Sequence, residues 1–234
     1  AAPVAPYWPA FGTHGKQRIT VRTLLNHRAG LHGVDAPITL DDISLRLDDV
    51  AQLLARQTPR WTPGQDQGYH GVTYGLYADV LFRRIADESI GTFLRREVTR
   101  PLDADFFLGL PVEHEWRVAT NYPVTTRERL LRILPKAAGS RSPEGRVYRS
   151  VARGGDTALA FAQPRELGPA GVDNYNSRRV HSMELPWVSG VSNGRSLCRV
   201  FAALANGGEL DGVQLVRHEV LEPVMRRQSW SERD

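Results

Sequence analysis

Apolar residues recur every three or four positions along most of this chain, which is the spacing of an α-helix rather than of a β-strand. A fold built mainly from helices is therefore predicted. The segments that carry this spacing most clearly are 47–57, 73–88, 89–98, 193–206 and 217–228. The stretch 139–180 is instead rich in Gly, Ser and Arg, so it is predicted to be loop.

Shorter signals complete this picture. Thr20 stands where a helix N-cap is expected, and Gly30 follows as a stop, which predicts a helix of about two turns between them. Residues 31–46 show no periodicity and are predicted to be irregular. A helix is expected over 125–134, and the stretch 208–216 (GELDGVQLV) reads as a small β-hairpin.

Composition excludes several classes of protein. No apolar run approaches the roughly 18 residues of a membrane-spanning helix. The single Cys198 excludes a disulfide framework and is expected to be a buried, inert thiol. The net charge is +4, but the basic residues are interleaved with 26 acidic ones, so nucleic-acid binding is not favoured. Only Lys16 and Lys136 are available for lysine chemistry.

Metal and nucleotide sites find no support in the sequence. The seven histidines are scattered, and none forms an H-E-x-x-H pair. Neither G-x-x-x-x-G-K-[ST] nor G-x-G-x-x-G occurs. No metal and no other cofactor is therefore expected.

One short motif suggests a nucleophile. Residues 190–194 (GVSNG) match G-x-S-x-G, the turn that exposes the catalytic serine of α/β-hydrolases. That interpretation would make Ser192 the nucleophile, with Asp211 and His218 as the downstream partners. The preceding residues contain a proline and few β-branched side chains, so the favoured interpretation is that Ser192 or Asn193 caps the next helix.

Several longer phrases occur in a fixed order. They are ITVRTLLNHRAGL (19–31), WTPGQDQGYHGVTYGLYADVLFRRI (61–85), SIGTFLRREVTRPLDADFFLGLP (89–111) and NGRSLCRVFAALANGGELDG (193–212). Together they closely resemble the serine β-lactamase-like superfamily, which includes penicillin-binding proteins. The resemblance is closest to the class C β-lactamase-like esterases of family VIII type. It implies an α+β, β-lactamase/transpeptidase-like fold, of which residues 1–234 would form a single domain that is mainly helical with an incomplete sheet.

The same resemblance points to candidate site residues. In that family a tyrosine five residues after a Pro-Gly pair assists as a base, and here that position is Tyr69. The family motif Y-x-N reads Tyr69-His70-Gly71, so the asparagine that contacts a β-lactam amide is absent. This departure favours an esterase-like member. His70 and Trp187 are the expected substrate-binding residues, although His70 is equally compatible with simple exposure. His27 is expected to be a scaffold residue.

The family nucleophile itself is not among these residues. It lies in an S-x-x-K motif, but Thr13 precedes Lys16 by three positions and Ile133 precedes Lys136. The family's later K-T-G or H-x-G strand is not found either. The favoured interpretation is therefore a serine hydrolase that acts on a small ester or amide through an acyl-enzyme, with its nucleophile outside residues 1–234. A non-catalytic pseudoenzyme or binding domain of the same fold is the alternative. No signal peptide is visible, which slightly favours the cytoplasm, and the oligomeric state stays open.

Overall fold

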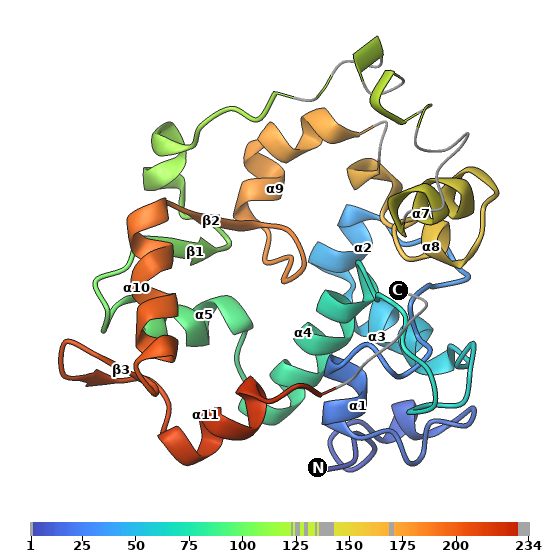
Figure 1. Cartoon of the computed structure of the whole chain (residues 1–234), viewed down its shortest axis with the longest axis horizontal. Helices are drawn as coiled ribbons and strands as arrows, with labels where there is room; N and C mark the ends of the chain where they lie inside the picture. The colour runs from blue at the N-terminus through green and yellow to red at the C-terminus, as the bar shows by residue number, and fades with distance from the viewer. Residues whose placement is uncertain are drawn as a thin grey trace.

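The computed structural model describes residues 2–122, 143–168 and 171–228, together with the isolated positions 124, 127–128, 131–133 and 135. Figure 1 shows two groups of helices, with α4 running between them. The N-terminal helices α1 to α3 lie on one side of α4, and α9, α10 and β1–β2 lie on the other side.

The helical elements of the described residues are α1 (Val21–Leu25), α2 (Leu40–Leu45), α3 (Leu47–Arg56), α4 (Thr73–Ala86), α5 (Ile90–Leu94), α7 (Pro143–Ala152), α8 (Asp156–Leu159), α9 (Arg178–Ser182), α10 (Gly194–Ala205) and α11 (His218–Met225). The short 3-10 turns are η1 (Pro9–Gly12), η3 (Val112–Arg117), η4 (Arg165–Leu167) and η5 (Val172–Asn176), and η2 (Arg95–Thr99) is a π-helical turn that extends α5. The strands are β1 (Phe106–Leu108), β2 (Gly190–Ser192), β3 (Glu209–Leu210) and β4 (Val213–Gln214).

Side-chain caps explain where several helices begin. Thr20 caps α1, Ser89 caps α5 and Asn193 caps α10, and each side-chain oxygen accepts the backbone N–H three residues ahead. The predicted caps Thr20 and Asn193 are thus confirmed, as are the helices expected over 47–57, 73–88, 193–206 and 217–228. The segment 89–98 is helical too, although its second half is the π turn.

Three local predictions are wrong. Residues 31–46 are not all irregular, because Thr39 and Asp42 form a reciprocal capping box that starts α2. The first helix ends at Leu25, well before Gly30, because His27 adopts a left-handed backbone with φ of 59°. The segment 139–180 contains, in its described part, two helices, two 3-10 turns and the start of a third helix, α9. Half of the positions of the helix expected over 125–134 lie outside the described residues.

The larger hydrophobic core joins α1 to α4. Its centre is an aromatic cluster of Trp8, Phe11 and Tyr77, with ring centroids 5.3 to 6.1 Å apart. The buried Tyr77 hydroxyl donates to the carbonyl of Leu54 at 3.0 Å, so its polar atom is satisfied. This packing fixes α4 against α3 and thereby fixes the loop that precedes α4.

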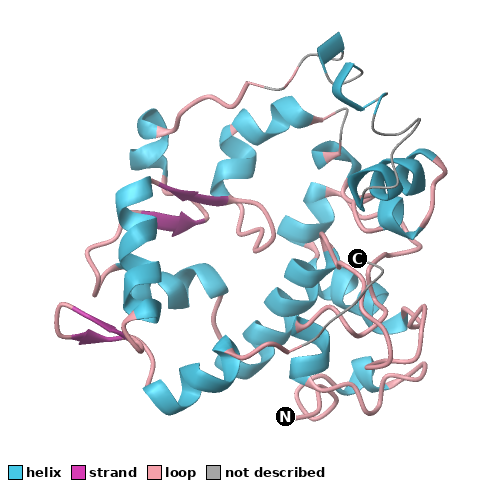
Figure 2. Ribbon diagram, in the orientation of Figure 1, coloured by secondary structure: helices cyan, strands magenta, loops and turns pink. Residues whose placement is uncertain are grey.

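Sheet structure is sparse in the described part of the chain. Strands β1 and β2 pair antiparallel, with Phe107 opposite Val191, and β3 pairs with β4 in the predicted hairpin. Figure 2 shows both pairs among a large excess of helix. A second small core, around Leu102 and Ala203, packs α10 against the segment before β1. The prediction of a mainly helical chain with an incomplete sheet is confirmed.

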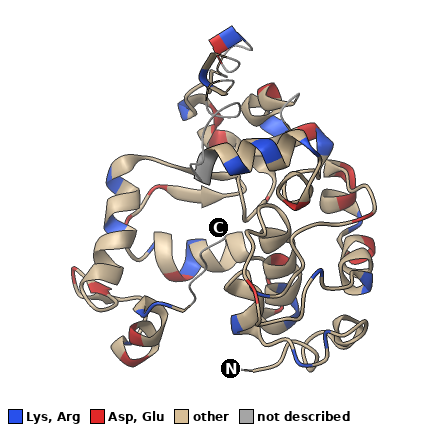
Figure 3. Ribbon diagram, turned by 45° about the vertical axis from the view of Figure 1, so that its right-hand side comes forward, with Lys and Arg blue, Asp and Glu red and all other residues tan. Residues whose placement is uncertain are grey.

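Surface features correct one further expectation. Cys198 is exposed on α10 rather than buried. In the view of Figure 3, basic and acidic residues are scattered over the ribbon without a separate region of either sign. No helix within the described ranges combines the length and apolar content needed to cross a bilayer.

Candidate functional site

Tyr69 lies on the loop that joins α3 to α4, and neighbouring backbone holds this loop in place. The Gly68 N–H donates to the His27 carbonyl at 3.1 Å, and the Gly64 N–H donates to the Arg28 carbonyl at 2.9 Å. The Arg28 guanidinium returns a hydrogen bond to the Gly64 carbonyl. The loop is thus tied to the turn after α1, while the Tyr69 side chain stays 60% exposed.

Two histidines support this loop from beneath. The His70 N–H donates to Nδ1 of His27 at 3.1 Å, so that His27 nitrogen carries no proton. His70 Nε2 accepts the Leu31 N–H at 2.9 Å, and Nδ1 donates to the Gly68 carbonyl at 2.6 Å. His70 is only 1% exposed, and burial lowers the pKa of its imidazole from 6.5 to about 4. The neutral ring is therefore a structural clamp between the two loops.

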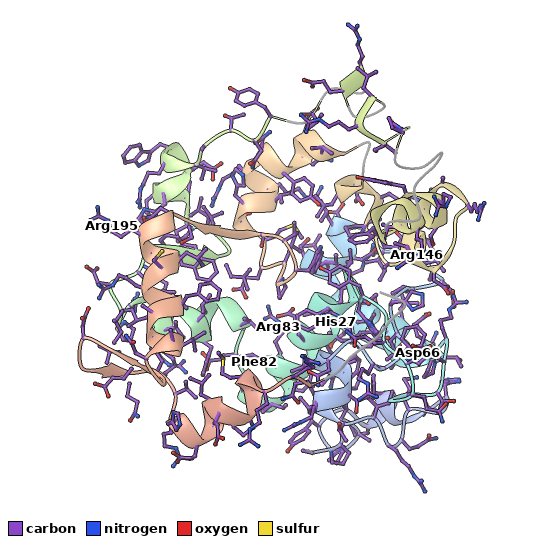
Figure 4. All side chains as sticks on the ribbon, viewed as in Figure 1. His27, Asp66, Phe82, Arg83, Arg146 and Arg195 are labelled. Atoms are coloured by element: carbon purple, nitrogen blue, oxygen red, sulfur yellow. The ribbon has the colours of Figure 1, made fainter. Side chains whose placement is uncertain are left out.

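The Tyr69 ring packs between residues from different parts of the chain. Its centroid lies 5.1 Å from that of His27 and 5.8 Å from that of Phe161. Figure 4 labels His27 beside α4, with Asp66 farther out on the loop. Phe161 lies two residues after the end of α8, so a residue 92 positions downstream in the sequence packs against one side of the Tyr69 ring.

Two glycines four residues apart make room for the aromatic neighbours of Tyr69. A Cβ on Gly71 would lie 2.7 Å from the Phe161 ring and 2.9 Å from the Ala160 carbonyl oxygen. A Cβ on Gly75 would lie 2.6 Å from the Trp187 ring. Neither distance is compatible with a side chain at those positions, so Gly71 seats Phe161 and Gly75 seats Trp187.

Tyr69 and Phe161 form a wall shared by two cavities. The first, here the Trp187 cavity, measures about 380 Å³. It is lined by Tyr69, Gly71, Val72, Phe161, Gln163, Pro164, Leu167, Gly168, Val172, Tyr175, Trp187 and Val188. The second, here the His32 cavity, measures about 490 Å³ and is lined by His27, His32, Trp61, Gln67, Gly68, Tyr69, Val147, Asp156, Thr157, Ala160 and Phe161. Small-molecule sites are concave and mostly apolar, as these are.

A larger cavity of about 860 Å³ lies elsewhere, between α2–α3, α4 and the end of α9. Three of the charged groups that line it form hydrogen bonds. The Arg83 Nε donates to both carboxylate oxygens of Asp79 at 3.1 Å, and Glu184 accepts from the Ser89 hydroxyl at 2.8 Å and the Gly91 N–H at 3.0 Å. In Figure 4, Arg83 lies toward the centre of the molecule, away from Asp66. Because none of the predicted site residues lines this cavity, we place the candidate site at Tyr69 instead.

The structure brings together two of the three predicted site residues. Tyr69 and Trp187 line the same cavity. His70 lies next to Tyr69 in sequence but is buried and does not line either cavity, so the exposure considered for it is wrong. That His70 contacts a substrate stays a prediction. Phe161 and Tyr175 were missed, because the segment that carries them shows no readable periodicity.

The alternative nucleophile and the lysines lie elsewhere. Ser192 ends a short antiparallel strand, and its hydroxyl donates to the Asp105 carbonyl at 3.0 Å. A helix follows one residue later, but Ser192 lies within the strand, paired with Phe106, and not on the strained turn that exposes the serine of an α/β-hydrolase. Lys16 is fully buried and donates to the Gln57 carbonyl at 2.5 Å, and burial lowers its pKa to about 8. Lys136 lies outside the described residues, within which no cluster of three His, Cys, Asp or Glu could hold a metal.

Comparison with known proteins places this geometry in a family. The family model described as Beta-lactamase matches residues 1–233. A curated relative, the esterase/beta-lactamase LipL of Mycobacterium tuberculosis, is 31% identical over 231 residues, which is 96% of this chain and 49% of LipL. The chain therefore spans about half the length of that relative.

Two solved structures agree. A family VIII carboxylesterase is 31% identical, with a TM-score of 0.76 over 96% of this chain and 53% of its own. A penicillin-binding protein homologue from Caulobacter crescentus is 29% identical, with a TM-score of 0.74 over 97% of this chain and 54% of its own. The described part has the helical portion of the β-lactamase/transpeptidase-like fold. The chain belongs to the beta-lactamase family, whose members include esterases, β-lactamase-like hydrolases and penicillin-binding protein homologues.

Proposed function

We propose that this chain supplies the acid/base tyrosine and the acyl-binding walls of a serine hydrolase that acts on small esters or related acyl compounds. The nucleophilic serine is proposed to lie outside residues 1–234, and it would form a covalent acyl-enzyme during turnover. The relatives in the comparison are an esterase/beta-lactamase and a carboxylesterase, which supports hydrolysis as the reaction class.

The observation that carries the proposal is the presentation of Tyr69. Its ring projects from a loop fixed by backbone hydrogen bonds and stands between two cavities, with 60% of the side chain exposed. A tyrosine needed only for packing would bury its ring. An exposed phenol on a rigid loop can instead exchange a proton with a substrate that enters beside it.

The reaction divides into two steps. In the first, the serine attacks the ester carbonyl while its proton passes to an adjacent base, and the alcohol leaves after taking up a proton. In the second, water attacks the acyl-enzyme and releases the carboxylic acid. We assign proton transfer to and from the Tyr69 hydroxyl, and contact with the acyl group to Trp187. No cofactor takes part in this scheme.

Replacing Tyr69 tests the proposal. In the protein that carries this chain together with its nucleophile, Tyr69→Phe is expected to lower kcat for p-nitrophenyl butyrate by about 10²- to 10⁴-fold, the usual worth of an acid/base group. KM should change little, because the ring remains. Tyr122→Phe is the matched control, since Tyr122 is 88% exposed and lines neither cavity. Near wild-type turnover in Tyr69→Phe would refute the assignment.

A non-catalytic binding domain is the second candidate, and it is favoured by one observation. Neither lysine of these 234 residues stands three positions after a serine. If the protein that carries this chain also lacks an S-x-x-K motif, the cavities beside Tyr69 would bind acyl compounds without hydrolysing them. Turnover of p-nitrophenyl butyrate that is abolished by Tyr69→Phe would exclude this candidate.

A further inference from the structure

The Trp187 cavity is chemically uniform. Among the described residues that line it, none carries a charge. Two of its polar groups already have partners, since the Tyr175 hydroxyl donates to the Leu167 carbonyl at 3.0 Å and the Gln163 side-chain oxygen accepts the Ile38 N–H at 3.4 Å. A ligand there would meet aromatic and aliphatic surface and the edge of Tyr69.

The opposite side of the wall is different in character. The His32 cavity includes two imidazoles and the Asp156 carboxylate, which lies 3.4 Å from His32 Nε2. The Asp156 side chain is 75% exposed, so its carboxylate is in contact with water. Phe161 thus stands between a cavity that contains ionisable groups and one whose described lining residues carry no charge.

Phe161 is fixed in the wall by backbone as well as by its ring. The Val72 N–H donates to the Ala160 carbonyl at 3.2 Å, which ties the end of α8 to the start of α4. Gly71 leaves the space beneath the ring, and no side chain fits there while Phe161 holds this position. The position of the Phe161 ring is therefore set by the hydrogen bond between Val72 and Ala160 and by the ring's contact with Gly71.

We propose that Phe161 is a specificity-determining residue, which closes the Trp187 cavity into a pocket for an uncharged, apolar acyl group and excludes acyl groups that carry a carboxylate. This inference rests on the proposed function, because it names the acyl half of that function's substrate. Apolar groups gain free energy by leaving water for such a pocket. A carboxylate would lose its hydration there without meeting a cation among the described lining residues.

Binding to this chain tests the proposal without any turnover. Methyl butyrate and monomethyl succinate are similar in length but differ by one carboxylate at neutral pH. Ligand-detected saturation-transfer NMR should give an apparent affinity at least about tenfold higher for methyl butyrate, a conservative value for an unpaired buried carboxylate. Equal or tighter binding of monomethyl succinate would overturn the uncharged pocket.

Variants of Phe161 test the wall. Phe161→Ala should join the two cavities, so the ratio of apparent affinities for methyl butyrate over monomethyl succinate should fall to within about threefold. The apparent affinity for the bulkier methyl diphenylacetate should rise at least about fivefold relative to that for methyl butyrate. Phe161→Leu keeps apolar bulk and should retain most of the wild-type preference. Phe201→Ala is the matched control, because Phe201 is 61% exposed, against 49% for Phe161, and lines neither cavity.

The outcomes separate this inference from the proposed function. If Phe161→Ala keeps its circular dichroism spectrum and the ratios of apparent affinity between the ligands do not change, Phe161 does not determine the specificity of the cavity. Tyr69→Phe should leave all binding ratios as in the wild type, because it keeps the ring. If the ratios behave as stated but no ester is ever turned over, the acyl pocket stands and only the hydrolase assignment fails.

Discussion

The buried His70 makes the stability of this fold depend on pH in a defined window. Its pKa falls from 6.5 to about 4 because burial disfavours the imidazolium. Protonation would also remove the acceptor for the Leu31 N–H, since Nε2 would then carry a proton. Between these two pKa values the unfolded chain binds a proton that the folded chain does not, so the free energy of unfolding must fall as pH falls through this range.

The magnitude follows from the shift. One pKa unit corresponds to about 1.4 kcal/mol. The drop from 6.5 to about 4 therefore predicts that neutral His70 contributes about 3 kcal/mol, which is present above pH 6.5 and lost by about pH 4. Other groups titrate in this range too, so the quantity to compare is the difference between variants.

Urea unfolding followed by circular dichroism from pH 4 to pH 7.5 measures this contribution. His70→Gln should be less stable than the wild type at pH 7.5 and should show a shallower decline toward pH 4, by about 3 kcal/mol over the window. His14→Asn is the control, because His14 is exposed and asparagine tolerates its φ of 52°. Parallel pH profiles for His70→Gln and the wild type would refute the reasoning.

Two further substitutions test the packing and the capping described above. Gly75→Ala should lower the free energy of unfolding by about 2 kcal/mol and displace Trp187, because the new Cβ would lie 2.6 Å from its ring. Gly194→Ala is the control, because a Cβ there would meet nothing within 4 Å, and it should stay within about 1 kcal/mol of the wild type in urea unfolding. Equal effects of the two substitutions would contradict the seating of Trp187. Thr39→Ala should cost about 1 kcal/mol in the same assay, since it removes the side-chain oxygen that accepts the Asp42 N–H, and an unchanged midpoint would show that α2 does not depend on this cap.

Much of the helical architecture could be predicted, because caps and apolar spacing are local properties. Thr20, Ser89 and Asn193 each accept a bond from a backbone N–H three residues away, so the signal and the structure lie in the same few residues. The end of α1 could not be predicted in this way. His27 leaves the helix because its imidazole and carbonyl bind residues of the distant Tyr69 loop.

The site was predictable only in part. Tyr69 and Trp187 follow from resemblance to the family, and both line one cavity. No sequence pattern predicts Phe161, because its role depends on the packing of the residues after α8 against Gly71. These two segments are ninety residues apart, and no local pattern encodes a contact between them. In the sequence, Gly71 is notable only because it replaces the asparagine of the family motif Y-x-N. The structure adds that Phe161 and Ala160 occupy the space of any side chain there.

We propose that acyl transfer passes through a serine outside residues 1–234, beside Tyr69. Mass spectrometry can locate the acyl group in the nucleophile-bearing protein after it is mixed with p-nitrophenyl butyrate, quenched with acid and digested. One butyryl group is expected on a serine of a peptide outside these 234 residues, and it should form much more slowly in Tyr69→Phe. A butyryl group on Ser192 or on any other residue of this chain, or no covalent adduct during turnover, would contradict it.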